Sequence, residues 1–185
     1  MSVFTNPAGG AIEHARAYVS AILELLGDKD PIAVLRATAP ALERVVDTTP
    51  HHVLVRPEAP GKWSMGEVLA HLADSDLVWG WRLRLILAQD RPPLTGYDQD
   101  AWASRLGYAD SDPRDSVVMF SILRRTNLRL IGRAAPEDLQ RVGVHVERGE
   151  ESLAHHIKLY AGHDILHLNQ IERIRRGVSQ GKRSE

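Results

Sequence analysis

A long helical pattern between residues 64 and 89 constrains the fold of this chain more than any other feature of its sequence. Ser64 and Glu67 match the Ser-x-x-Glu capping box, in which each side chain accepts a hydrogen bond from a backbone amide at the start of a helix. Apolar residues then recur at helical spacing, and no proline interrupts them. A helix this long must bury one face against other long elements, so the pattern predicts a helical bundle.

A second bundle helix is expected before it, over residues 30–49. Asp30 is a suitable N-cap residue, and Pro31 occupies the first helical position, where a proline removes no helical hydrogen bond. Pro40 lies inside the apolar pattern and does remove one. We therefore expect this helix to be in pieces, followed by an extended segment over residues 51–62.

Two more helices complete a predicted bundle of residues 30–176. One starts at Asp112 and Pro113, an N-cap and first-position pair like that of the earlier helix. The last spans residues 152–176 and stops at Gly177 after several arginines, which suit a helix C-terminus. No strand pattern is sustained enough to build a sheet, so the sequence predicts an all-α four-helix bundle.

The remaining segments lie outside these four helices. Residues 1–29 are expected to form an N-terminal helical extension that stops at Gly27. Residues 91–111 are rich in turn-forming residues and indicate a long crossover loop with one short helix. Residues 177–185 are expected to be a disordered tail.

Composition excludes several classes of partner and site. The 23 lysines and arginines nearly balance 24 aspartates and glutamates, and no basic stripe indicates a nucleic-acid surface. The N-terminus lacks the pattern of a secretory signal, and no apolar run is long enough for a membrane span, which predicts a cytoplasmic protein without membrane contact. The chain has no cysteine, so any metal must be held by His, Asp or Glu.

Three histidines are placed to face the inside of the predicted bundle. His163 and His167 are four residues apart on the last helix, so their side chains leave the same face about one turn apart. That face also carries the apolar residues Leu159 and Leu166, which marks it as the buried face. His71 lies on the inward face of the helix that starts at Ser64, a position from which it can approach the other two histidines.

These histidines have two interpretations. As core residues each would need a hydrogen-bond partner, and two stacked imidazoles would repel each other if both were protonated. As ligands all three would stay neutral and share one divalent cation, an arrangement that bundle cores commonly build from facing helices. The spacing favours the metal site and leaves the metal-free core as the alternative.

Two motifs carry a resemblance to a known family. These are "KWSMGEVLAHLADSD" at residues 62–76 and "HHIKLYAGHDILHLNQIERI" at residues 155–174, of which "KWS" and the pattern GHDxxHxxQI are the most specific parts. With both motifs at this separation, the sequence over residues 30–176 resembles the DinB superfamily, including the YfiT-like proteins that are regarded as metal-dependent hydrolases. The resemblance is specific for the fold and leaves the substrate open.

The resemblance implies a four-helix bundle with an up-down-down-up connection, which agrees with the long crossover of residues 91–111. It implies that His71, His163 and His167 bind one divalent transition metal ion such as zinc, nickel or iron. Activities similar to those in the superfamily include hydrolysis and the transfer of a low-molecular-weight thiol, which would have to arrive here as a cosubstrate because the chain has no cysteine. Many members are homodimers, so a homodimer is also expected.

We therefore expect a metal-dependent enzyme that acts on an unidentified small molecule, as a hydrolase or as a thiol S-transferase. Three neutral imidazole ligands leave coordination positions open, which is typical of catalytic rather than structural metal sites. The sequence does not identify a catalytic base. A non-catalytic bundle, in which a metal or small ligand serves a structural or stress-related role, is the alternative.

Five further residues are candidates for the wall of a pocket beside the metal. Ser75 and Arg82 share the inward face of His71, and Arg82 could bind a substrate carboxylate with two hydrogen bonds or could reach solvent. His156 lies about two turns before the ligand pair and is expected in the wall rather than as a fourth ligand. Tyr160 and Trp102 could shape the pocket, although aromatic residues at helical spacing, Trp79 and Trp81 among them, more often pack in a core.

Other polar residues are assigned more ordinary roles. Glu67 could act as a base, but the capping box already accounts for it. Asp74 and Asp164 could accept hydrogen bonds from ligand imidazoles, yet a solvated helix flank is the favoured interpretation for both. His51 and His52 remain without an assigned role.

Overall fold

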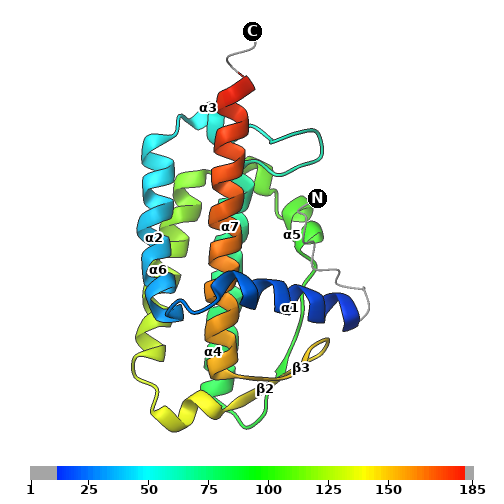
Figure 1. Cartoon of the computed structure of the whole chain (residues 1–185), viewed down its shortest axis with the longest axis vertical. Coiled ribbons are helices and arrows are strands. Elements are labelled where there is room, and N and C mark those ends of the chain that lie inside the picture. The colour runs from blue at the N-terminus through cyan, green and yellow to red at the C-terminus, as the bar shows by residue number, and fades with distance from the viewer. Residues whose placement is uncertain (1–11, 182–185) are drawn as a thin grey trace.

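Four long helices form the body of the molecule in the computed structural model, which describes the backbone of residues 12–181 and the side chains of residues 17–177. They pack side by side, and along the chain they run up, down, down and up (Figure 1). The helices are α2 (Pro31–Thr48), α4 (Met65–Ala88), α6 (Pro113–Ile131) and α7 (Leu153–Gly181). The predicted four-helix bundle and its connection are confirmed.

The helix α4 begins at the capping box that the sequence contains. The Ser64 hydroxyl accepts a hydrogen bond from the Glu67 amide at 3.2 Å, and the Glu67 carboxylate accepts one from the Ser64 amide at 2.7 Å. At the starts of α2 and α6, the carboxylates of Asp30 and Asp112 accept hydrogen bonds from backbone amides at 2.9 and 2.7 Å. Each of these three start positions was predicted correctly, because a cap depends only on residues close together in sequence.

Two predictions for residues 30–62 were wrong. The helix α2 is one continuous helix through Pro40, and not in pieces. The fully buried Leu35 and Leu42 lie on either side of the proline, and their packing holds the helix together despite one lost hydrogen bond. Residues predicted to be extended form the short helix α3 (His51–Leu54), which buries Leu54 against the bundle.

A small three-stranded sheet at the lower end of the bundle was not predicted (Figure 1). Strand β2 (Val142–His145) pairs in parallel with β1 (Pro93–Leu94) and antiparallel with β3 (Gly149–Ser152). The strands are two to four residues long, too short for an alternating pattern to be recognised in the sequence. The chain is therefore predominantly helical, and not purely so.

The crossover over residues 91–111 carries the chain from the lower end of α4 to the start of α6 (Figure 1). It contains the predicted short helix, α5 (Gln99–Arg105), and a 3-10 turn, η1 (Tyr108–Asp110). A second 3-10 turn, η2 (Pro136–Gln140), precedes β2.

The helix α1 (Ile12–Leu26) lies across α7 (Figure 1). It ends at Gly27, whose φ of 53° is the left-handed conformation expected of a glycine after a helix. The crossing is close because Gly162 has no side chain: a Cβ atom there would lie 2.3 Å from the backbone oxygen of Ile22. The segment expected to extend from the bundle is thus packed against it.

The last helix continues past the end predicted from the sequence. Gly177 does not adopt the positive φ that would stop the helix, and α7 runs on to Gly181. The remainder of the predicted tail, residues 182–185, lies outside the described residues. Among the helices described, none has both the length and the apolar character needed to cross a membrane.

The core consists of two apolar clusters separated by a layer of buried polar side chains. One cluster includes Leu42, Leu72 and Phe120, and the other includes Leu35 and Trp79. Along each long helix, buried polar residues occur between members of the two clusters: Thr38 on α2, Ser75 on α4, Arg124 on α6 and Asp164 on α7. The layer is made of these side chains: Thr38, His71, Ser75, Asp76, Arg124, His163, Asp164 and His167.

Candidate metal centre

Three buried histidines meet where α4 faces α7. The Nε2 atom of His163 lies 3.3 Å from Nε2 of His71 and 3.1 Å from Nε2 of His167. The side chains are buried, with exposed fractions of 0% for His71, 8% for His163 and 2% for His167. The three residues predicted as metal ligands are therefore brought together, and their Nε2 atoms converge on one point.

The spacing of these nitrogens suits a metal ion. Imidazole nitrogens bound at about 2.0–2.1 Å to a tetrahedral ion are separated from each other by about 3.3 Å. The two distances around His163 agree with that separation. The donor set, three imidazoles without thiolate or carboxylate, fits zinc, nickel or iron.

Hydrogen bonding within the cluster leaves it incompletely satisfied. His167 Nδ1 lies 2.8 Å from the side-chain oxygen of Gln170, so we assign the proton of His167 to Nδ1 and a free lone pair to Nε2. Nε2 of His163 is close to both His71 Nε2 and His167 Nε2. While all three imidazoles are neutral, only one of these two contacts can be a well-directed hydrogen bond. A cation at the point of convergence would pair with all three lone pairs.

Burial keeps the three imidazoles neutral. It lowers the pKa of His71 and His163 well below the ordinary value, and each imidazole would also repel a charge on its neighbours. For His167 burial lowers the pKa to about 4, although the hydrogen bond to Gln170 opposes the shift. Neutral imidazole is the form that binds metals.

A cavity of about 540 Å³, its open mouth included, lies beside His163. It is bounded by α1, α4, α7, the crossover and the turn between β2 and β3. Its polar lining consists of Tyr18, Ser75, Arg82, Tyr97, Gln99, Arg148, Tyr160 and His163. The cavity gives a small molecule access to the histidine cluster.

The five predicted pocket residues do not all reach this cavity. Ser75, Arg82 and Tyr160 line it. His156 is fully buried outside the lining, with Nε2 3.1 Å from a carboxylate oxygen of Glu151. Trp102 also lies outside the lining, where its ring packs 4.5 Å from that of Tyr97.

Sequence analysis missed four polar lining residues: Tyr18, Tyr97, Gln99 and Arg148. Tyr18 lies on α1, which was not expected to reach the site. Tyr97 and Gln99 lie in the crossover, whose unusual length was the one signal that it covers something. Arg148 lies in the turn between two strands that were not predicted.

Two of the residues given ordinary roles were misassigned, Asp164 and Trp81. Asp164 is fully buried and not on a solvated flank, because it binds Arg124 and Thr38. Asp74 accepts a hydrogen bond from the Tyr108 hydroxyl at 2.6 Å and has no contact with a ligand imidazole. That orienting contact comes from Gln170 instead.

One tryptophan packs on the cluster itself, because the ring centroid of Trp63 lies 5.2 Å from that of His71. Trp79 is fully buried in the core, as favoured, and stacks on Tyr160 with ring centroids 4.7 Å apart. The core position favoured for Trp81 was wrong, because its side chain is 60% exposed on the outer face of α4. His51 and His52 are exposed at the start of α3.

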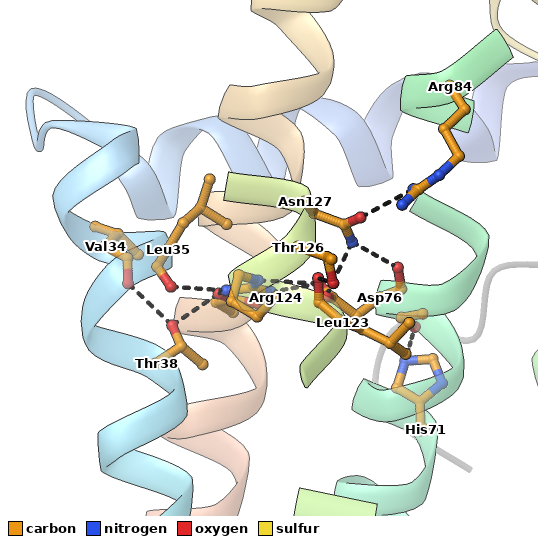
Figure 2. Close-up of polar contacts among 12 residues, drawn as sticks. Val34, Leu35, Thr38, His71, Asp76, Arg84, Leu123, Arg124, Thr126 and Asn127 are labelled. Atoms are coloured by element: carbon orange, nitrogen blue, oxygen red, sulfur yellow. Dashed lines mark hydrogen bonds and ion pairs between the residues drawn. The ribbon is translucent and has the colours of Figure 1, made fainter. Parts of the chain in front are cut away.

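A second buried polar cluster surrounds Arg124 of α6 (Figure 2). Its guanidinium donates hydrogen bonds to Asp76 at 2.9 Å, to Asp164 at 3.0 Å and to the Leu35 carbonyl at 3.0 Å. Asp76 also accepts from the Asn127 amide at 3.1 Å. This network joins all four bundle helices, and no pattern in the sequence indicated it.

Comparison with known proteins agrees with this fold and site. A family model described as the DinB superfamily matches residues 34–171. A "putative metal-dependent hydrolase" of Bacillus mycoides is 31% identical over 160 residues, covering 85% of this chain and 90% of the relative. Another protein with that description, from Bacillus cereus, is 30% identical over 169 residues, covering 80% of this chain and 96% of the relative.

Two further likenesses extend the comparison. A protein of the same description from Oceanobacillus iheyensis is 31% identical over 111 residues, covering 60% of this chain and 64% of the relative. Among solved structures, YfiT from Bacillus subtilis, described as a probable metal-dependent hydrolase with an unusual four-helix bundle topology, superposes with a TM-score of 0.75. It is 25% identical and the match covers 80% of this chain and 86% of YfiT. With a family model matching most of its length and relatives aligned along it, the chain belongs to the DinB superfamily.

Proposed function

We propose that this protein is a metal-dependent hydrolase of a small molecule, with one divalent ion of zinc, nickel or iron held by His71, His163 and His167. The observation that carries the proposal is the convergence of three neutral Nε2 atoms beside a cavity. The descriptions of the relatives support the reaction class.

The chain's own residues would prepare the site for that ion. The side-chain oxygen of Gln170 accepts a hydrogen bond from Nδ1–H of His167, which fixes the tautomer that directs the Nε2 lone pair inward. Ser75 lies 3.4 Å from His71 Nε2 and 2.9 Å from the Tyr97 hydroxyl, which places neutral donors at the edge of the cavity. A divalent ion bound by neutral imidazoles keeps its full charge and can activate water or polarise a substrate.

Thiol transfer is the second candidate, and the composition of the cavity favours it. No carboxylate belongs to the described lining, so no Asp or Glu there is placed to act as a general base. A thiol cosubstrate would depend less on a general base, because its sulfur is readily deprotonated beside a cation. The chain itself has no cysteine to act in its place.

Metal analysis of untagged protein tests the site. The wild type should hold about one equivalent of transition metal after reconstitution, and His163→Ala should hold less than about a tenth. The matched control is His51→Ala, which removes an exposed imidazole outside the cluster and should leave the metal content unchanged. A metal-free wild type, or an equal loss in the control, would refute the metal centre.

Activity assays then separate the reaction classes. Metal-loaded protein is offered an activated ester, and separately an aryl halide with cysteine, whose thiolate would displace the halide ion. Ester hydrolysis lost in His163→Ala supports a hydrolase, and thiol-dependent halide release lost in that variant supports a transferase. Full metal binding with neither reaction, together with unfolding on chelation, would instead support the structural alternative.

We also propose that the protein is a homodimer, as the family resemblance implies. Exposed apolar side chains on the neighbouring helices α4 and α6, among them Trp81 at 60% and Val118 at 58%, offer a surface for it. Light scattering should give twice the chain mass for the wild type and the chain mass for Trp81→Glu. A monomeric wild type would contradict the proposal.

A further inference from the structure

The cavity beside the histidine cluster contains a buried guanidinium without a carboxylate partner. Arg82 of α4 is 6% exposed, and its described hydrogen bonds go to neutral acceptors. Nη2 donates to the Thr95 carbonyl at 2.5 Å, and Nη1 donates to the Tyr160 hydroxyl at 3.3 Å. Among the side chains that the structure describes, none accepts a hydrogen bond from the buried Nε of Arg82.

The buried Arg124 and the partly buried Arg148 show how this chain neutralises such a charge with carboxylates. Arg124 lies between the carboxylates of Asp76 and Asp164. Arg148, on the same cavity as Arg82, forms two hydrogen bonds with Glu151, at 2.5 and 2.9 Å. An unpaired buried charge carries a large desolvation cost, so the buried Arg82 calls for an anionic partner that the described chain does not supply.

His145, which lies next to the Arg82 guanidinium, adds a second hydrogen-bond donor instead of an acceptor. His145 Nδ1 accepts a hydrogen bond from the Glu147 amide at 3.2 Å, so in the neutral imidazole the proton is on Nε2. That atom lies 3.5 Å from Nη2 of Arg82, and both carry N–H groups. Two donors facing each other would be satisfied by an anionic oxygen.

The guanidinium and the histidine cluster are connected through Tyr160. The hydroxyl of this residue accepts from Arg82, and its ring centroid lies 6.0 Å from that of His163. Arg82, Tyr160 and His163 line the same cavity, and the described lining contains no Asp or Glu. A single small molecule can therefore contact both the arginine and the histidine cluster.

We propose that Arg82, supported by Arg148, forms a subsite for a carboxylate of the small molecule that reacts at the histidine cluster. The substrate or thiol cosubstrate would then be an organic acid rather than a neutral or cationic molecule. Arg82 provides N–H donors that carboxylate oxygens accept, and charge-assisted bonds of this kind are strong. The position of the reacting end rests on the proposed metal centre, whereas the subsite can be tested without metal.

Calorimetric titration of the metal-free full-length protein provides the first test. The probes are succinate and its neutral diamide, which have similar shape, at constant ionic strength. Succinate should bind wild type at least about tenfold more tightly than the diamide, as expected for charge-assisted hydrogen bonds. Equal binding of the two probes would overturn the proposal without any variant.

Two variants show whether Arg82 is responsible. Arg82→Met should weaken succinate binding at least about tenfold, whereas Arg125→Met, which removes an exposed guanidinium, should not change it. If Arg82→Met does not fold, Arg82→Lys keeps the charge without the forked geometry and should also weaken binding. Full succinate binding in a folded Arg82 variant would show that Arg82 only ties the crossover to α4 through Thr95.

A cobalt-loaded sample distinguishes this proposal from the metal centre. Mercaptosuccinate and 2-mercaptoethanol are compared by the absorption that appears when a thiolate binds cobalt. The carboxylate-bearing thiol should bind at least about tenfold more tightly, and Arg82→Met should remove the difference. Absence of bound cobalt would refute the metal centre alone, and equal binding of the two thiols to loaded protein would refute the carboxylate subsite alone.

Discussion

The two buried polar clusters of this bundle differ in whether the chain satisfies its own polar groups. Around Arg124, each charged side chain has a partner of opposite charge, and Asn127 completes the hydrogen bonding of Asp76. Around His163, three lone-pair nitrogens converge, and nearby Arg82 has no described carboxylate partner. The first arrangement stabilises a fold, and the second is complete only with a ligand.

The two clusters are built on the same helices, so one positions the other. On α7, Asp164 follows His163 directly, and the two side chains leave the helix about 100° apart. Arg124 and Thr38 hold Asp164 from one side, which fixes the rotation at which α7 presents His163. On α4, Asp76 does the same for the helix that carries His71.

The largest effect is expected from breaking the satisfied cluster. Arg124→Met leaves the carboxylates of Asp76 and Asp164 buried without a counter-charge, and should lower the free energy of unfolding by about 3–5 kcal/mol. Urea denaturation of metal-free protein measures it. Arg125→Met removes a neighbouring exposed guanidinium and should change stability by less than about 0.5 kcal/mol.

A substitution in the histidine cluster provides the comparison for the free energy of unfolding. His163→Gln, measured in the same metal-free conditions, should change the free energy of unfolding by less than about 1 kcal/mol, since the lost nitrogen contacts were poorly satisfied. A loss as large as that of Arg124→Met would remove the distinction between the clusters.

The next prediction concerns how closely α1, which forms one wall of the cavity, packs on α7. Gly162→Ala places a Cβ 2.3 Å from the Ile22 backbone oxygen, so α1 must shift, at a cost of up to about 3 kcal/mol in the free energy of unfolding. Gly177→Ala is the control, because nothing lies within 4 Å of a Cβ there, and it should be neutral or slightly stabilising. Equal stability of the two variants would show that α1 does not pack closely on α7.

The features predicted correctly from the sequence are those that short-range patterns determine. Caps at Asp30, Ser64 and Asp112 and apolar spacing located the long helices, because both depend on neighbours within a few turns. The inward positions of His71 and the later histidine pair followed from helix geometry, and the family resemblance named them as ligands. Their convergence within one cluster is the structure's contribution.

What could not be predicted depends on neighbours distant in sequence. Asp164 looked like a solvated flank because nothing nearby in the chain shows that Arg124, forty residues away, is directed at it. The contribution of α1 to the cavity depends on a single glycine that permits the crossing. Arg148 reaches the cavity only because a short hairpin folds there, and strands that short leave no recognisable pattern.

A smaller effect, on metal affinity, is expected from removing the hydrogen bond that orients the imidazole of His167. Gln170→Ala removes the acceptor of the His167 Nδ1 proton and should weaken metal binding about 10–100-fold, with little change in fold. Competition with a chromophoric chelator measures the affinity. The exposed neighbour Asn169→Ala should bind metal as the wild type does, and unchanged affinity in Gln170→Ala would mean that His167 is held by packing alone.

The smallest effect is a change in the pH dependence of stability at His145. Burial, with Arg148 and Arg82 nearby, lowers the pKa of His145 from 6.5 to about 3 despite the opposing charge of Glu151. Between these values the folded protein keeps His145 neutral while the unfolded chain binds a proton, so the free energy of unfolding falls as the pH falls below about 6.5. His145→Gln should remove about 1.4 kcal/mol of this loss for each pH unit across the window, measured by urea denaturation of metal-free protein between about pH 6.5 and 4.5. Identical slopes for variant and wild type would mean that His145 is protonated in the folded state. A cationic His145 beside Arg82 would require an anionic partner supplied by the chain, and the two clusters would no longer differ as described.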